Sequence, residues 1–172
     1  MSKNELKNFK LKDMNIRILS YLSLFIAFVA VATYIYIPGP ASSYFNLGEV
    51  AIYILALTFG AKSAGIAGAL GASLVDVLLG YSIWAPFTLI IKGLEGFVVG
   101  KIARQDREKG SLQYNVLAIF IGGNIMVAGY ALTKGLLISW AAVLPEIGID
   151  YAQLIVGGAV ALPIARQLNK HF

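Results

Sequence analysis

The sequence predicts an all-α polytopic membrane protein with six transmembrane helices and both termini in the cytoplasm. Hydrophobic residues make up 58% of its 172 residues and charged residues only 13%, and the mean hydropathy is +0.75. A soluble domain is about 45–50% apolar and about 25% charged. The apolar residues form stretches separated by Gly, Pro or charged residues, the pattern expected of successive membrane spans. Soluble globular and disordered chains are therefore excluded.

The breaks between the apolar stretches place the elements in order. A Pro-Gly-Pro turn closes the first span, Gly60 stops a short second span, and Gly80 follows the third. The expected spans cover residues 16–37, 47–59, 63–79, 86–102, 112–138 and 149–165. Residues 1–15 are expected to form a charged cytoplasmic arm, and residues 16–172 a single membrane domain.

The basic residues set the expected orientation. Twelve Lys or Arg residues lie before the first span, in alternate loops or after the last span, whereas the loops near 38–46, 80–85 and 139–148 contain none. Basic loops stay in the cytoplasm, so both termini are expected there. Because topology accounts for the basic excess, we expect no nucleic-acid partner.

Several kinds of chemistry are excluded by the residues present. The chain has no cysteine, and His171 is its only histidine, so neither a thiolate nucleophile nor a metal site of Cys or His ligands is expected. The sequence lacks the GxxxxGK[ST] phosphate-binding loop. We therefore expect no catalytic residues, no bound metal and no nucleotide site in this chain.

Polar residues within the spans gather in the predicted outer half of the membrane. Ionisable groups in spans are costly and usually face a cavity. Lys92 and Glu95 lie three residues apart on one helix face and can form an ion pair, either to bind a polar ligand or only to hold helices together. Glu49 and Lys134 are close enough to the headgroups to be interfacial. The polar residues in the outer half are Glu49, Asp76, Lys92, Glu95, Asn124, Lys134 and Gln153.

Aromatic residues gather at the same outer end. They are Tyr34, Tyr36, Tyr44, Phe45, Tyr81, Trp84, Trp140 and Tyr151. An aromatic belt normally occupies both interfaces, so this one-sided excess favours a pocket in which a flat ring stacks on aromatic faces. The loop PGPASSYFN could cover that pocket as a lid.

Stripes of small residues occur in several spans. Span three reads AKSAGIAGALGAS, and span four contains Gly96 and Gly100 in a GxxxG pattern. Ser23 and Ala27 form a similar stripe on span one. Small residues let helices approach closely in lipid, so these stripes either pack internally or dock against a separate membrane subunit.

The assembled motifs resemble a known family. The stretch YFNLGEVAIYILALTFGAKSAGIAGALGASLVDVLLGYSIWAPFTLIIKGLEGFVVGKIA (44–103), above all APFTLIIKGLEGFVVG, is similar to the substrate-binding S components of energy-coupling factor (ECF) vitamin transporters. The similarity is greatest to the riboflavin-type and hydroxymethylpyrimidine-type branch. It implies a prokaryotic plasma-membrane protein that captures a vitamin or vitamin precursor. Its implied partners are a membrane coupling protein and two ATP-binding subunits, which use the ATP.

The resemblance also implies site residues. Family members bind ligand with the first outer loop and the outer parts of helices four to six. Asp76 and Trp84 are added to this set because they lie at the same predicted outer end. Together, the expected substrate-binding residues are Tyr44, Asp76, Trp84, Lys92, Glu95, Asn124, Tyr130, Tyr151 and Gln153. In the family an AxxxA stripe on the first helix meets the coupling protein, and Ser23 and Ala27 offer SxxxA at that place.

The resulting functional expectation is the binding subunit of an ATP-driven importer for a small heteroaromatic compound. Hydroxymethylpyrimidine or a related thiamine precursor is expected first, and riboflavin or pyridoxine next. The alternative is a small homo-oligomeric carrier or channel that uses Lys92, Glu95 and Asp76 as an ion or proton relay. A membrane enzyme with Asp76 and Glu95 as acid and base would lack any supporting motif.

Overall fold

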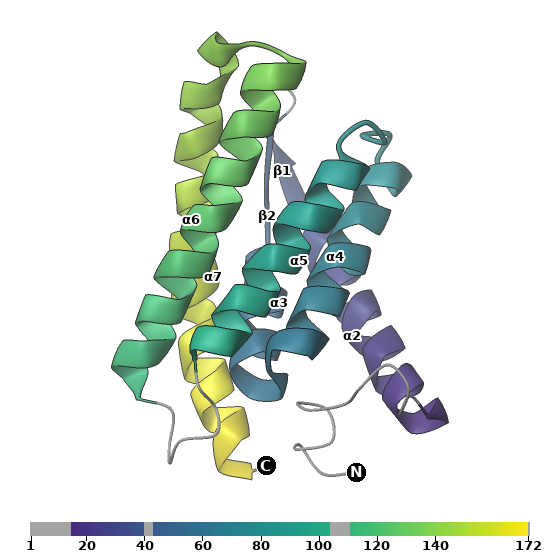
Figure 1. Cartoon of the computed structure of the whole chain (residues 1–172), viewed down its shortest axis with the longest axis vertical. Helices are drawn as coiled ribbons and strands as arrows, with labels where there is room; N and C mark the ends of the chain where they lie inside the picture. Colours follow the sequence, from purple (N-terminus) through teal and green to yellow (C-terminus); the bar gives the residue numbers. More distant parts are fainter. Residues whose placement is uncertain (1–14, 40–42, 104–110, 172) are drawn as a thin grey trace.

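The computed structural model describes residues 15–39, 43–103 and 111–171, which form six α-helices and a β-hairpin (Figure 1). The helices are α2 (Ile16–Tyr34), α3 (Gly48–Phe59), α4 (Ala61–Leu78), α5 (Ala85–Ile102), α6 (Leu112–Leu137) and α7 (Val143–His171). A 3₁₀ turn, η2 (Trp140–Ala142), precedes α7, and the antiparallel strands are β1 (Tyr36–Pro38) and β2 (Tyr44–Asn46). The predicted helical class is confirmed.

Four segments are long and apolar enough to cross a bilayer within the described residues: α2, α4, α6 and the segment from η2 through α7. Helix α3 is apolar but has only 12 residues, and α5 carries Lys92, Glu95 and Lys101. That all six helices cross the membrane, and that both termini are cytoplasmic, therefore remain predictions from the sequence.

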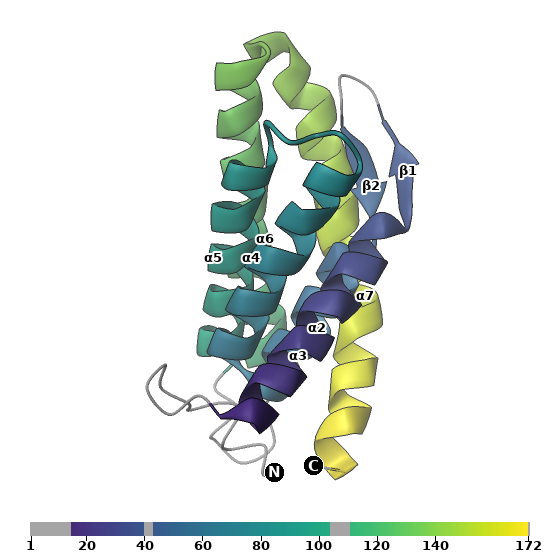
Figure 2. The same cartoon turned by 90° about the vertical axis from the view of Figure 1, so that its right-hand side faces the viewer.

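The two ends of the bundle differ in what they carry. The β-hairpin, the α4–α5 turn and the α6–α7 turn lie at one end, and the start of α2 and the end of α7 lie at the other (Figures 1 and 2). Arg17 lies at the start of α2, and Arg166 and Lys170 lie near the end of α7; Lys62 is at the start of α4 and Lys101 at the end of α5. The other basic residues used for the topology, in 3–12 and 104–109, fall outside the described residues, as does most of the predicted arm at 1–15.

Small residues bring α4 and α5 into close contact. A Cβ added at Gly96 would lie 2.7 Å from the Ala64 carbonyl oxygen, and one at Gly68 would lie 2.8 Å from the Lys92 carbonyl oxygen. On another face of α4, a Cβ at Gly71 would lie 2.7 Å from the Ile26 carbonyl oxygen of α2. The stripes in α4 and α5 are therefore used for packing within the bundle.

Helix α3 is surrounded by the other helices. All of its residues except Val50 and Phe59 are buried. It packs closely on α7, because a Cβ added at Gly157 would lie 2.5 Å from the Cβ of Glu49. At its other end Gly60, with φ of 87°, joins α3 directly to α4. A positive φ is readily adopted only by glycine. Gly60 can therefore reverse the chain between the two helices by itself.

The boundaries that differ most from the sequence-based expectation are the end of α2 and both ends of α7, which extends to His171 rather than to residue 165. Helix α2 ends at Tyr34 rather than at residue 37, because the next residues pair in the hairpin, with Ile37 opposite Phe45. The last helix begins at Val143 rather than at residue 149. Pro145 is compatible with this start because N–H groups in the first turn of a helix have no acceptor within the helix, so the N–H that proline lacks is not missed. Glu146, in the same turn, interacts favourably with the helix dipole.

Candidate functional site

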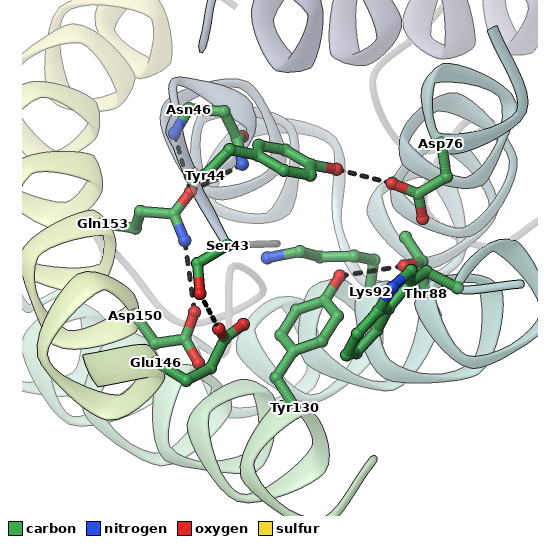
Figure 3. Close-up of a pocket in the computed structure, with 11 residues that line it drawn as sticks. Ser43, Tyr44, Asn46, Asp76, Thr88, Lys92, Tyr130, Glu146, Asp150 and Gln153 are labelled. Atoms are coloured by element: carbon green, nitrogen blue, oxygen red, sulfur yellow. Dashed lines mark hydrogen bonds between the residues drawn. The ribbon is translucent and has the colours of Figure 1, made fainter. Parts of the chain in front are cut away.

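A pocket lies at the hairpin end of the bundle, between β2, α4, α5, α6 and α7 (Figure 3). The cavity volume is about 30 Å³. Polar and aromatic residues form its wall: Ser43, Tyr44, Asn46, Asp76, Trp84, Thr88, Lys92, Tyr130, Glu146, Asp150 and Gln153.

Lys92 is the centre of a buried ionic cluster at the base of this pocket. Its Nζ donates to Glu49 Oε1 of α3 and, at 3.2 Å, to Glu95 Oε2. Tyr53 donates its hydroxyl to the other oxygen of Glu95 at 2.7 Å. Both carboxylates are 0% exposed. One ammonium group thus holds two carboxylates from different helices, and it also lies 5.4 Å from the ring centre of Tyr130.

Lys134 forms a second buried cluster that connects the hairpin to α6 and α7. Its Nζ donates to Glu146 Oε2 at 2.6 Å and to Ser43 Oγ at 2.9 Å, and Ser43 donates to the same carboxylate oxygen. The ammonium also lies 5.1 Å from the ring centre of Trp84. This cluster fixes Ser43 in the pocket wall and places an ammonium group against the ring of Trp84.

Amide groups fasten β2 to α7. The backbone N–H and the side-chain amide of Asn46 both donate to Gln153 Oε1, at 2.8 and 2.6 Å. Gln153 in turn donates from Nε2 to Asp150 Oδ1 at 3.3 Å. The other side of Asn46 accepts from the Gly48 N–H at 2.7 Å, which positions the start of α3.

Tyr44 projects from β2 across the pocket toward α4. Its hydroxyl donates to Asp76 Oδ1 at 2.5 Å, and its ring stacks on Tyr81 with centres 5.6 Å apart. Burial, reinforced by the nearby Asp76 charge, raises the pKa of the Tyr44 hydroxyl above its ordinary value. The phenol therefore keeps its proton and acts as a donor to Asp76.

The structure places the predicted binding residues in three groups. Six line the pocket: Tyr44, Asp76, Trp84, Lys92, Tyr130 and Gln153. Glu95 lies behind Lys92 and orients it. Asn124 and Tyr151 do not line the pocket, because they bond to each other at 2.9 Å between α6 and α7, where Tyr151 is exposed.

Glu49 and Lys134, which could have been exposed interfacial groups, are both fully buried in ion pairs. Sequence reasoning also missed five pocket residues, and it missed Glu146 because it treated residues 139–148 as a loop. Glu146, Asp150 and Gln153 have the i, i+4, i+7 spacing of one helix face, which is a signal that could have found them. The pocket residues that were missed are Ser43, Asn46, Thr88, Glu146 and Asp150.

The predicted docking residues on α2 lie away from the pocket. Ser23 and Ala27 are both exposed, and the Ser23 hydroxyl donates to the Leu19 carbonyl of its own helix at 3.0 Å. The buried face of α2 is instead formed by Ile18, Leu22, Phe25, Val29 and Thr33. The Ser23–Ala27 stripe is therefore not used for packing among the described residues.

This arrangement defines a class: a multi-pass membrane protein with a polar and aromatic pocket at one end of its bundle. A family model described as "ECF-type riboflavin transporter, S component" matches residues 13–170. The chain belongs to this family, and it is a transporter component rather than an enzyme.

Two relatives support this assignment. The chain is 31% identical over 156 residues to the thiamine precursor transporter HmpT of Lactococcus lactis subsp. cremoris (strain MG1363), with 88% of each chain covered. It is also 35% identical over 138 residues to an uncharacterized protein encoded in the gap 3′ region of Pyrococcus woesei, covering 77% of this chain and 90% of the relative. The family resemblance expected from residues 44–103 is thus confirmed.

Proposed function

We propose that this chain is the substrate-binding subunit of an ATP-driven importer in a prokaryotic plasma membrane. Its ligand is hydroxymethylpyrimidine or a related thiamine precursor, ahead of riboflavin and pyridoxine. A membrane coupling protein and two ATP-binding subunits complete the importer and use the ATP, so the chain itself holds no cofactor. The observation that supports this function most directly is the pocket of Tyr44, Trp84, Lys92 and Tyr130 in a chain of the S-component family.

The pocket favours a small, flat and polar ligand. Tyr44, Trp84 and Tyr130 provide ring faces, and the carboxylates and amides around them provide hydrogen-bonding partners. The cavity is small, about 30 Å³. Its size favours a single pyrimidine ring over the fused three-ring system of riboflavin. The name of the HmpT relative points to the same ligand class.

Tryptophan fluorescence tests ligand entry into this pocket. The chain has two tryptophans: Trp84 is 8% exposed and lines the pocket, whereas Trp140 is 64% exposed and lies outside its lining. We expect hydroxymethylpyrimidine to quench the purified protein at submicromolar concentration. Trp140→Phe, which leaves Trp84 alone, should keep the quench, and Trp84→Phe should lose it. If the quench is instead lost in Trp140→Phe and kept in Trp84→Phe, the ligand binds outside this pocket.

Transport in vesicles separates this function from the carrier alternative. The purified chain alone should bind hydroxymethylpyrimidine but should not accumulate it, with or without an ion gradient. Accumulation should require the coupling protein, the ATP-binding subunits and ATP. If vesicles containing only this chain concentrate the compound when a proton gradient is imposed, the relay through Lys92, Glu95 and Asp76 becomes the better account.

A further inference from the structure

The described carboxylates are all gathered around the pocket. Three of them line it, namely Asp76, Glu146 and Asp150, and two lie directly beneath it on Lys92, namely Glu49 and Glu95. Only two cations, Lys92 and Lys134, accompany these five acidic groups in the described part of the chain. The pocket region therefore has more buried carboxylates than its own lysines can neutralise.

The two lysines are already engaged by three of the carboxylates. Lys92 pairs with Glu49 and Glu95, and Lys134 pairs with Glu146. Asp76 and Asp150 form no ion pair among the described residues. Asp76 Oδ1 accepts a hydrogen bond from the Tyr44 hydroxyl, and Asp150 Oδ1 accepts one from the Gln153 amide. The Thr88 hydroxyl of α5 is a further hydrogen-bonding neighbour of the Asp76 carboxyl.

The second oxygen of each of these two aspartates has no partner. Asp76 Oδ2 and Asp150 Oδ2 accept no hydrogen bond from any described residue, although their side chains are only 1% and 2% exposed. The two groups lie on different walls of the same pocket, Asp76 on α4 and Asp150 on α7 (Figure 3). A buried carboxylate oxygen without a donor is unfavourable, and these two are placed where a ligand could supply the donors.

We propose, on the basis of the function above, that Asp76 and Asp150 select a nitrogen-rich ring that presents N–H donors on two sides. An amidine-type ring such as a 4-aminopyrimidine meets this requirement. Its exocyclic amino group donates to one carboxylate. The ring nitrogen opposite that group, protonated from solvent, donates to the other, so that the two donor edges of the ring meet the two carboxylates. The pocket rejects an anionic compound, such as a phosphate ester of the same ring, because its negative charge would be repelled by the pocket carboxylates.

A matched pair of compounds tests this selection. Titration calorimetry in detergent would compare 4-amino-5-hydroxymethyl-2-methylpyrimidine with its 4-oxo analogue, in which an oxygen replaces the amino group. A hydrogen bond to a charged group is worth about 1.5–3 kcal/mol, so the amino compound should bind roughly ten- to hundredfold more tightly. The phosphate ester of the amino compound should bind at least as weakly as the oxo analogue.

Two variants assign the preference to residues. Asp76→Asn and Asp150→Asn should each lower the affinity for the amino compound by roughly tenfold or more. The affinity for the oxo analogue should change much less, so the preference for the amino compound becomes smaller or reverses. Ser73→Ala is the matched control on α4, because the Ser73 hydroxyl bonds only carbonyls of its own helix and does not line the pocket. It should leave both affinities unchanged. Thermal melting of each variant shows whether it is folded.

The outcomes separate this inference from the proposed function. Equal affinity of the wild-type protein for the amino and oxo compounds, or tighter binding of the phosphate ester, overturns the donor-edge selection whether or not the variants fold. Binding of riboflavin with no binding of either pyrimidine overturns it too, and in both cases the importer function stands. If no pyrimidine, riboflavin or pyridoxine binds the wild-type protein, the proposed function and this inference fail together.

Discussion

Replacing Lys92 with methionine is expected to destabilise the protein by about 3–5 kcal/mol, the usual effect of removing one partner from a buried ion pair. The change leaves Glu49 and Glu95, which come from different helices and are fully buried, without their shared cation. Their mutual repulsion acts directly on the contact between α3 and α5. A large fall in thermal melting temperature, together with loss of hydroxymethylpyrimidine binding, is the expected measurement.

A second variant separates charge balance from folding. The triple change Lys92→Met, Glu49→Gln and Glu95→Gln removes the cation and both carboxylates, and it should recover much of the lost stability because a neutral cluster avoids unpaired buried charge. Lys92→Met alone should therefore melt well below the triple variant. Equal melting temperatures for the wild-type protein and Lys92→Met would contradict the structural role of this cluster.

Replacing Ala27 with tryptophan is expected to abolish ATP-dependent uptake while the isolated chain binds ligand with unchanged affinity. Ala27 is exposed on α2 and lies outside the pocket lining, so a large ring there should be tolerated by the chain itself. It would, however, prevent the close helix approach that Ser23 and Ala27 allow. Copurification with the coupling protein, uptake in reconstituted vesicles and ligand titration measure the three properties.

The control for this variant is Ala159→Trp, an exposed alanine on α7. It introduces the same ring on a different face of the bundle and should leave assembly and uptake close to normal. An equal loss of uptake in both variants would mean that any added bulk on the outer surface interferes. Loss of ligand binding in Ala27→Trp would mean that this part of α2 supports the pocket.

The helical class and most helix positions could be predicted because they follow from local properties of the sequence. Gly60 and Gly80 lie where helices end and have a positive φ, which is a local property of glycine. Apolar runs identify buried or lipid-facing segments without knowledge of the fold. The start of α7 could not be placed in this way, because Gly148 and Pro145 are also typical of loops. The hairpin was missed as well, since its two strands have only three residues each.

The candidate site was predictable in part for a related reason. Lys92 and Glu95 are neighbours on one helix, so their spacing alone brings them together. That Glu49 also pairs with Lys92 depends on how α3 lies against α5, and the pairing of Lys134 with Ser43 and Glu146 depends on three separate elements. The spacing of residues along the sequence does not predict such contacts between helices. These contacts nevertheless determine whether a polar residue such as Glu49 or Lys134 is exposed or buried.

The short buried helix α3 has a consequence for how the protein enters the membrane during synthesis. Twelve residues give a helix of about 18 Å, against a hydrocarbon core of about 30 Å, so α3 is too short to be held as an independent span. Gly60 connects it to the 18-residue α4 without an intervening loop. We therefore expect α3 and α4 to be integrated into the bilayer as one hairpin-like unit, with Glu49 carried in by both helices.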